Sequence, residues 1–170
     1  MQQQPDSSLT KWMVILAWIC GFGLLAFVFA DLLESQINPN RSPSSSNTGG
    51  FVEVTLMQNR QGHYVASGTI NDEPVVFLVD TGATDVSIPA HLADELGLIP
   101  QRRAYAQTAN GVVEIAETQL DSITLGDITL RNVDANLNPG MQGEKILLGM
   151  SFLKQIEFTQ RGDALILRTL

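Results

Sequence analysis

Residues 75–83 read Val-Val-Phe-Leu-Val-Asp-Thr-Gly-Ala. Five consecutive apolar residues, three of them β-branched, predict a buried strand that ends at Val79. Asp80, Thr81 and Gly82 follow at once, so the strand delivers a carboxylate directly into a tight turn. Backbone N–H groups in such a turn can hold an acid in a fixed position.

Alternating apolar residues and turn residues surround this stretch and predict further strands. Asn110-Gly111 stands between two strand-like runs and predicts a hairpin, and Gly126-Asp127 predicts a second one. Short helices are expected only over residues 91–96 and 150–154. Residues 51–170 are therefore predicted to form one mainly β domain, large enough for a core of its own.

Residues 51–170 resemble the retropepsin-like aspartic proteases of clan AA, including bacterial members that are anchored to a membrane. In that family an apolar strand leads into Asp-Thr-Gly-Ala, a hairpin flap follows, and an apolar-apolar-Gly segment packs beneath the catalytic turn before a short helix. The matching parts here are residues 77–83, the hairpin at Asn110-Gly111, and residues 147–149. The resemblance implies a closed acid-protease β-barrel with a flap hairpin and one or two short helices.

The resemblance also assigns roles to single residues. Asp80 would be the catalytic acid, Thr81 would hydrogen-bond across a dimer axis, and Gly82 would let the backbone approach the carboxylate closely. Six residues would contact substrate, and three would support the site from beneath. The first group is Ala83, Thr84, Asp85, Ala109, Asn110 and Gly111, and the second is Leu147, Leu148 and Gly149.

Two positions depart from the retroviral members of the family. Those enzymes commonly have an acid after Asp-Thr-Gly-Ala and an Arg after the later Gly, whereas this chain has Thr84 and Met150. Both halves of an ion pair are therefore missing together. Asp85 is a candidate for a related role, and the simpler interpretation is a solvated turn residue.

Peptide hydrolysis by carboxyl groups needs two acids in opposite protonation states, one to activate water and one to protonate the carbonyl oxygen. Two carboxyls about 3 Å apart share one proton, because the repulsion between two carboxylates makes ionisation of both energetically unfavourable. Only one Asp-Thr-Gly occurs in this chain, at Asp80. A homodimer that brings two copies of Asp80 together is the simplest solution.

Residues 12–30 carry no charge and are long enough to cross a bilayer as a helix. A single transmembrane anchor over residues 12–33 is the favoured interpretation; a cleaved signal peptide and a buried core helix are the alternatives. Lys11 precedes the span, whereas Asp31 and Glu34 follow it. The positive-inside rule therefore predicts a cytoplasmic tail at residues 1–11 and a periplasmic or otherwise extracytoplasmic protease domain at the inner membrane.

Residues 34–50 are mostly Ser, Asn, Pro and Gly. This composition buries too little apolar surface to offset the entropy of ordering, so it predicts a flexible linker. A linker of this length keeps the following domain close to the bilayer. Protein or peptide substrates are therefore expected near the membrane.

The composition argues against several other functions. The net charge is −8 and no run of Lys or Arg occurs, so nucleic acid is not an expected partner. Cys20 is the only cysteine and His63 and His91 stand far apart, so neither a metal site nor a cofactor is expected. The sequence therefore favours a membrane-anchored aspartic endopeptidase. Two alternatives are an inactive peptide-binding or assembly module with the same fold and a structural membrane tether.

Overall fold

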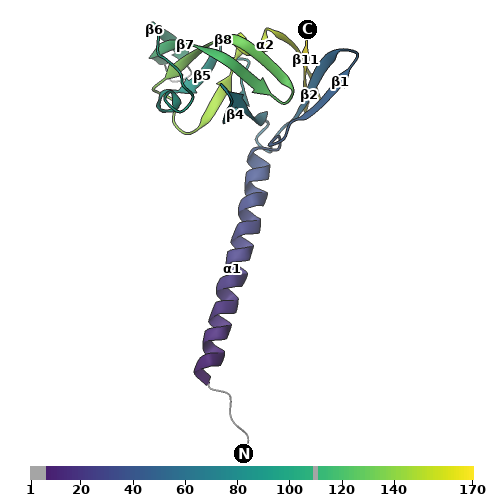
Figure 1. Cartoon of the computed structure of the whole chain (residues 1–170), viewed down its shortest axis with the longest axis vertical. Coiled ribbons are helices and arrows are strands. Elements are labelled where there is room, and N and C mark those ends of the chain that lie inside the picture. The colour runs from purple at the N-terminus through teal and green to yellow at the C-terminus, as the bar shows by residue number, and fades with distance from the viewer. Residues whose placement is uncertain (1–6, 109–110) are drawn as a thin grey trace, which may run out of the picture. The chain divides into compact units, whose positions relative to one another are not determined.

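The computed structural model describes residues 7–108 and 111–170, which separate into two compact units that meet between Gln36 and Ile37 (Figure 1). The described residues of the first unit belong to one helix, α1, at Ser7–Ile37, whose last residue is counted with the second unit. The segment Thr10–Ile37 is apolar enough and long enough to cross a membrane, and no part of its apolar window is buried. The helix runs four residues beyond the expected end at residue 33. It stops at Asn38, because the following Pro39 disfavours helical geometry in the residue before it.

The second unit contains a closed barrel. Within its described residues, the barrel sheet has seven strands in the order β3-β4-β9-β5-β8-β7-β6. A further pairing of β3 with β7, at Thr69 with Thr124 and Ile70 with Ile123, closes the sheet on itself. The strands are β3 Val65–Ile70, β4 Glu73–Val79, β5 Val86–Pro89, β6 Arg103–Thr108, β7 Gly111–Leu125, β8 Ile128–Asn138 and β9 Lys145–Leu148.

A smaller antiparallel sheet accompanies the barrel, with the order β1-β2-β11-β10 among the described residues. Its strands are β1 Ser44–Thr48, β2 Phe51–Met57, β10 Ile156–Arg161 and β11 Ala164–Thr169. Val54 on β2 lies opposite Leu167 on β11, and both side chains are fully buried. The apolar face of this sheet and the inside of the barrel contribute to one hydrophobic core, which includes Phe77 and Phe152.

The polar segment before β2 is ordered, so the expectation of a flexible linker over residues 34–50 is wrong for much of that segment. Asn40 is 4% exposed, and its side chain joins two strands. Its Nδ2 donates to the carbonyls of Met57 (2.9 Å) and Val65 (2.7 Å), and its Oδ1 accepts from the N–H of Met57. Asn38 donates to the hydroxyl of Ser67 (2.9 Å). Backbone groups at the end of β2 and the start of β3 thereby gain partners that neighbouring strands do not supply.

The predicted hairpin at Gly126-Asp127 is confirmed. Leu125 and Ile128 form the last pair of the β7–β8 ladder, and Gly126 has φ +57°. This turn also contacts the smaller sheet, because the N–H of Asp127 donates to the hydroxyl of Ser45 (3.1 Å). A side chain on Gly126 would overlap that hydroxyl at 2.6 Å, so the close packing requires glycine.

The two expected short helices have different outcomes. Residues 150–154 contain the helix α2 at Met150–Leu153, as predicted. Residues 91–96 form only one 3-10 turn, η1, at Ala90–Leu92, followed by irregular turns. Gly97, with φ +64°, then reverses the chain, and the N–H of Leu98 donates back to the carbonyl of Ala93 (2.8 Å). The segment between Pro89 and Gly97 is too short for a stable helix to propagate.

Candidate active site

Asp80 lies immediately after the last residue of β4, at the start of a turn that its own carboxylate helps to close. The N–H of Gly82 donates to Oδ1 of Asp80 at 2.9 Å, and the N–H of Ala83 donates to the carbonyl of Asp80 at 3.2 Å. Asp80 is half-buried, whereas Thr81 and Gly82 are exposed. The backbone therefore fixes one carboxylate oxygen and leaves the top of the turn accessible.

Strand β9 lies between the strand that enters this turn and the strand that leaves it. β9 pairs in parallel with β4, with Val79 opposite Leu148, and it also contacts β5. The N–H of Asp80 donates to the carbonyl of Leu148 (3.1 Å). The turn from Asp80 to Asp85 therefore crosses over the end of β9, so two segments distant in sequence determine the position of the carboxylate.

Gly149 lies directly beneath the crossing. Its neighbour Met150 donates its N–H to the carbonyl of Ala83 (2.8 Å), and Ser151 donates to the carbonyl of Thr84 (2.9 Å). A Cβ on Gly149 would stand 2.8 Å from the Ala83 carbonyl oxygen, closer than real side chains come. The structure thus brings the expected supporting segment, residues 147–149, into direct contact with the turn.

Ser151 is a site residue that the sequence reasoning missed. It is 2% exposed, and its Oγ accepts a hydrogen bond from the N–H of Val86 at 2.9 Å. This bond ties the start of β5 to α2 in a chain that has Thr84 and Met150 in place of an ion pair. A small hydroxyl residue two positions after the glycine of the apolar-apolar-Gly segment was the available signal, because Ser and Thr commonly satisfy free backbone donors.

Asp85 is half-buried at the end of the turn, among like charges. Burial raises the pKa of its carboxyl, and the carboxylates of Asp134 and Glu117 raise it further, while Lys154 opposes the shift. Arg102 donates twice to Glu117, at 2.7 and 3.0 Å, and this hydrogen bonding lowers the pKa of Glu117. Asp85 therefore takes up a proton more readily than an ordinary surface aspartate.

The hairpin expected to serve as a flap is formed by β6 and β7. Thr108 lies opposite Gly111, and the hydroxyl of Thr108 donates to the Gly111 carbonyl (2.8 Å). The connecting residues Ala109 and Asn110 lie outside the described residues. Gly111 has φ +113°, but the ladder makes it the first paired residue of β7. The ladder therefore makes Gly111 a paired strand residue, whereas the sequence predicted it as a central residue of an Asn110-Gly111 turn.

One face of this hairpin carries small apolar side chains and the other carries polar ones. Ala104 pairs with Ile115 and Ala106 with Val113 on the apolar face, whereas Tyr105 lies opposite Glu114 on the other. A Cβ on Gly140, in the loop before β9, would be 3.5 Å from Val113. The hairpin therefore packs beside that loop at Val113, two residues after Gly111. In the described part of the chain, no group of three or more His, Cys, Asp or Glu side chains is arranged to hold a metal ion.

Comparisons with known proteins agree with this architecture. Residues 66–155 match the family of gag-polyprotein putative aspartyl proteases. The chain is similar to an uncharacterized protein from the cobV 5′ region of a Sinorhizobium species (33% identity, 82% of this chain) and to one from Rickettsia prowazekii (30% identity, 94% of this chain). It spans 62% of the length of the first relative and 69% of the second.

Among solved structures, the fold is similar to a retropepsin-like aspartic protease from Rickettsia conorii. The TM-score is 0.58 at 28% identity, over 75% of this chain and 94% of that one. A mainly β barrel with an aspartate delivered by a strand into a glycine turn is the architecture of acid proteases. This chain belongs to the retropepsin-like aspartic protease family.

Proposed function

We propose that this chain is a membrane-anchored aspartic endopeptidase whose active site is completed by a second copy of the chain. The observation that carries the proposal is the Asp80 turn, in which the N–H of Gly82 holds one carboxylate oxygen. A module that only binds peptides has no chemical need for an acid fixed in this way. Membership of a protease family supports the same conclusion.

The reaction requires two carboxyl groups that share one proton. One ionised Asp80 accepts a proton from water while the protonated Asp80 of the second copy donates to the carbonyl oxygen of the scissile bond. The water oxygen bonds to the carbonyl carbon to give a gem-diol. The C–N bond then breaks as the amine takes the proton that came from the water, and a diol hydroxyl returns a proton to the second Asp80 as the C=O bond re-forms. Because this chain contains a single Asp-Thr-Gly, a symmetric dimer supplies the second group.

The surrounding residues take the roles that their positions allow. Thr81, exposed at the top of the turn, hydrogen-bonds across the dimer axis, and Gly82 positions the carboxylate. Ala83, Thr84 and Asp85 line one side of the substrate path. Gly111, the first paired residue of β7, closes over the substrate together with Ala109 and Asn110, and Leu147, Leu148 and Gly149 hold the turn from beneath.

The apolar helix suggests where this enzyme works. Residues 12–33 anchor the chain in the inner membrane, residues 1–11 stay in the cytoplasm, and the protease domain lies in the periplasm or another extracytoplasmic space. The charges at Lys11 and Glu34 support this orientation. Asn38 and Asn40 are already fixed to the domain, so only a short chain separates it from the helix. The substrates are therefore proteins or peptides close to the bilayer surface.

Subunit mixing tests the shared site. The full chain, purified in detergent, should cleave an unfolded, carboxymethylated protein, and Asp80→Asn should abolish cleavage, whereas Asp94→Asn should not. After verified subunit exchange, an equal mixture of wild-type and Asp80→Asn chains should retain about one quarter of the activity, because only wild-type pairs hold two acids. Retention of one half would show that a single chain is active. No cleavage by the wild-type chain under any pH condition would favour a peptide-binding module.

A reporter fusion tests the orientation. Alkaline phosphatase joined to the C-terminus should be active, because this enzyme needs an oxidising compartment for its disulfides. A fluorescent cytoplasmic reporter at the same position should be dark. The reverse pattern would place the protease domain in the cytoplasm.

A further inference from the structure

A pocket of about 290 Å³ lies at a distance from the catalytic turn. Its apolar walls are built by Val75 and Val76 of β4 and by Leu92 and Leu96 of the η1 segment. The rest of the lining consists of Ser67, Gly68, Pro74, Glu95 and Glu144. The cavity is therefore an apolar groove with two carboxylates at its margin.

The position of the pocket separates it from the proposed active site. Val76 pairs with Lys145 at the start of β9, whereas Asp80 follows the end of β4. The four-residue separation along a strand corresponds to about 13 Å. A ligand in this pocket would therefore contact the first half of β4, and the catalytic turn follows the other end of the strand.

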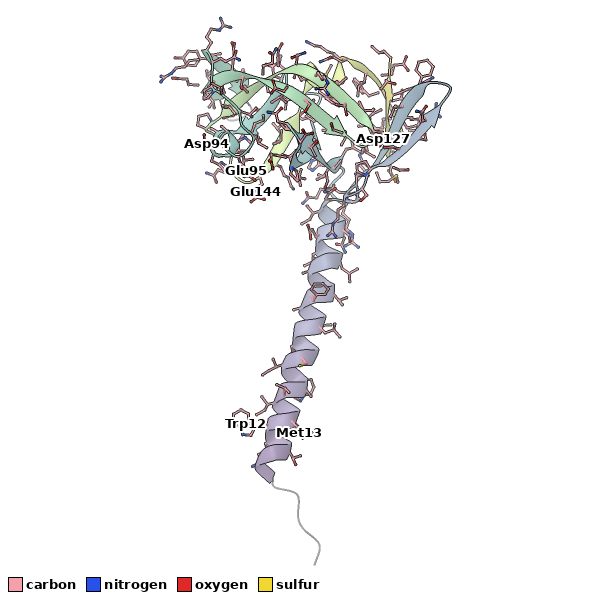
Figure 2. All side chains as sticks on the ribbon, viewed as in Figure 1. Trp12, Met13, Asp94, Glu95, Asp127 and Glu144 are labelled. Carbon is pink, nitrogen blue, oxygen red and sulfur yellow. The ribbon has the colours of Figure 1, made fainter. Side chains whose placement is uncertain are left out.

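Acidic side chains outnumber basic ones near the pocket, where Lys145, which follows Glu144 and pairs with Val76, is a basic neighbour. Asp94, Glu95 and Glu144 lie on the same side of the domain, and Asp127 lies well away from them (Figure 2). Within the described residues, neither Glu95 nor Glu144 has a hydrogen-bond or ion-pair partner. Two carboxylates without a cationic partner beside an apolar surface favour a ligand that brings both an apolar group and a positive charge.

We propose that this pocket binds a polypeptide segment in which an Arg or Lys stands beside a Leu-sized apolar side chain. The apolar side chain fills the space between Val76 and Leu96, and the cation lies between Glu95 and Glu144. Phosphate-bearing ligands are repelled by the same carboxylates. The proposal concerns binding alone, and it holds whether or not Asp80 performs catalysis.

A direct binding measurement tests the proposal on the full chain with Asp80→Asn, which prevents cleavage of the probe. The protein is placed in phosphatidylcholine nanodiscs, so that the membrane itself carries no net charge. The probe is a fluorescein-labelled peptide, Gly-Ser-Leu-Arg-Leu-Ser-Gly, and binding is followed by fluorescence anisotropy. Saturable binding is expected, and it should weaken in 0.5 M NaCl, since salt screens partly exposed charge pairs.

Matched variants locate the site. The double variant Glu95→Gln/Glu144→Gln should weaken binding about five- to tenfold, as expected for losing two partly exposed charge pairs. The double variant Asp121→Asn/Asp127→Asn changes the net charge equally and should bind as the parent does. Peptides with Glu in place of Arg, or Gly in place of both Leu residues, should bind at least about fivefold more weakly.

Methyl NMR of the same complex completes the test. The methyl signals of Val75, Val76, Leu92 and Leu96 should shift on titration, and those of Val112 and Val113 on the hairpin should not. Shifts confined to the hairpin would assign the peptide to the substrate path and overturn the proposal. Equal affinity in the Glu95→Gln/Glu144→Gln variant, or no saturable binding up to about 1 mM peptide, would also overturn it.

Discussion

A Cβ placed on Gly149 would lie 2.2 Å from the carbonyl oxygen of Asp85, so the backbone of the turn rests directly on a residue without a side chain. Both partners are constrained, because the two carbonyls before Asp85, those of Ala83 and Thr84, accept hydrogen bonds from the N–H groups of Met150 and Ser151. Glycine at position 149 is thus a condition for the geometry around Asp80.

Gly149→Ala is expected to destabilise the domain by about 3 kcal/mol or more and to abolish peptide cleavage, since backbone atoms must move to admit the methyl group. Urea denaturation and a cleavage assay measure the two effects. Gly140→Ala is the matched control, because the nearest neighbours of its Cβ would be side-chain atoms, of Asn138 at 3.2 Å and of Val113 at 3.5 Å, rather than backbone atoms. Wild-type activity in Gly149→Ala would contradict the supporting role of this contact.

Asn40→Ala should reduce the free energy of unfolding by about 2–4 kcal/mol. The substitution leaves the N–H and carbonyl of Met57 and the carbonyl of Val65 without their side-chain partner, and each unsatisfied buried group is costly. Urea denaturation of the Asp80→Asn chain avoids self-digestion during the measurement. Asn47→Ala, at an exposed position of β1, should have little effect. Equal stability of both variants would show that the Asn40 bonds contribute nothing.

Gly111→Val should lower peptide turnover at least about tenfold. A β-branched residue resists the positive φ at this position, and a strain of about 1–3 kcal/mol in the hairpin disfavours the closed form. Steady-state kinetics on a peptide substrate measure the effect. Val112→Thr, at the next and exposed position, keeps a β-branched side chain and should retain activity. Unchanged peptide turnover in Gly111→Val would show that the conformation of this hairpin does not affect catalysis.

Asp85→Asn should make the domain more stable near pH 7 by up to about 1 kcal/mol and should leave it unchanged near pH 3. Burial and nearby carboxylates raise the pKa of Asp85 in the folded state above its unfolded value. The folded protein therefore holds this proton more tightly, and stability from this group is lost as the pH rises through the folded pKa. Urea denaturation at several pH values gives the comparison, with Asp121→Asn as control. A variant less stable than wild type at pH 7 would indicate a favourable charge interaction at Asp85.

Local sequence signals predicted the parts of the fold that depend on neighbouring residues. The apolar run before Asp80 became β4, and Gly126-Asp127 became a two-residue turn, because strand burial and turn chemistry are encoded within a few positions. The prediction of a helix over residues 91–96 is wrong, because the apolar spacing of so short a segment does not show that the chain reverses direction at Gly97.

The sequence alone does not predict contacts between segments that are far apart along the chain. The run Ser-Ser-Ser-Asn-Thr has no apolar alternation, yet it forms β1 because β2 offers it a complete antiparallel edge. The side chain of Asn40 bridges Met57 and Val65, and nothing in its own neighbourhood indicates those partners. Ser151 was overlooked for the same reason, since its backbone partner Val86 is far away in the chain.

The insertion of β9 between β4 and β5 also determines when the site can form during synthesis. A ribosome completes Asp80 and β5 long before it reaches Leu148, and until then the N–H of Asp80 and the carbonyl of Ala83 lack their partners. Pairing between distant segments is slow to form, because the intervening chain must first close a long loop. A nascent or prematurely terminated chain therefore carries the aspartate without the bonds that position it, so the proposed site is complete only once nearly the whole domain has been made.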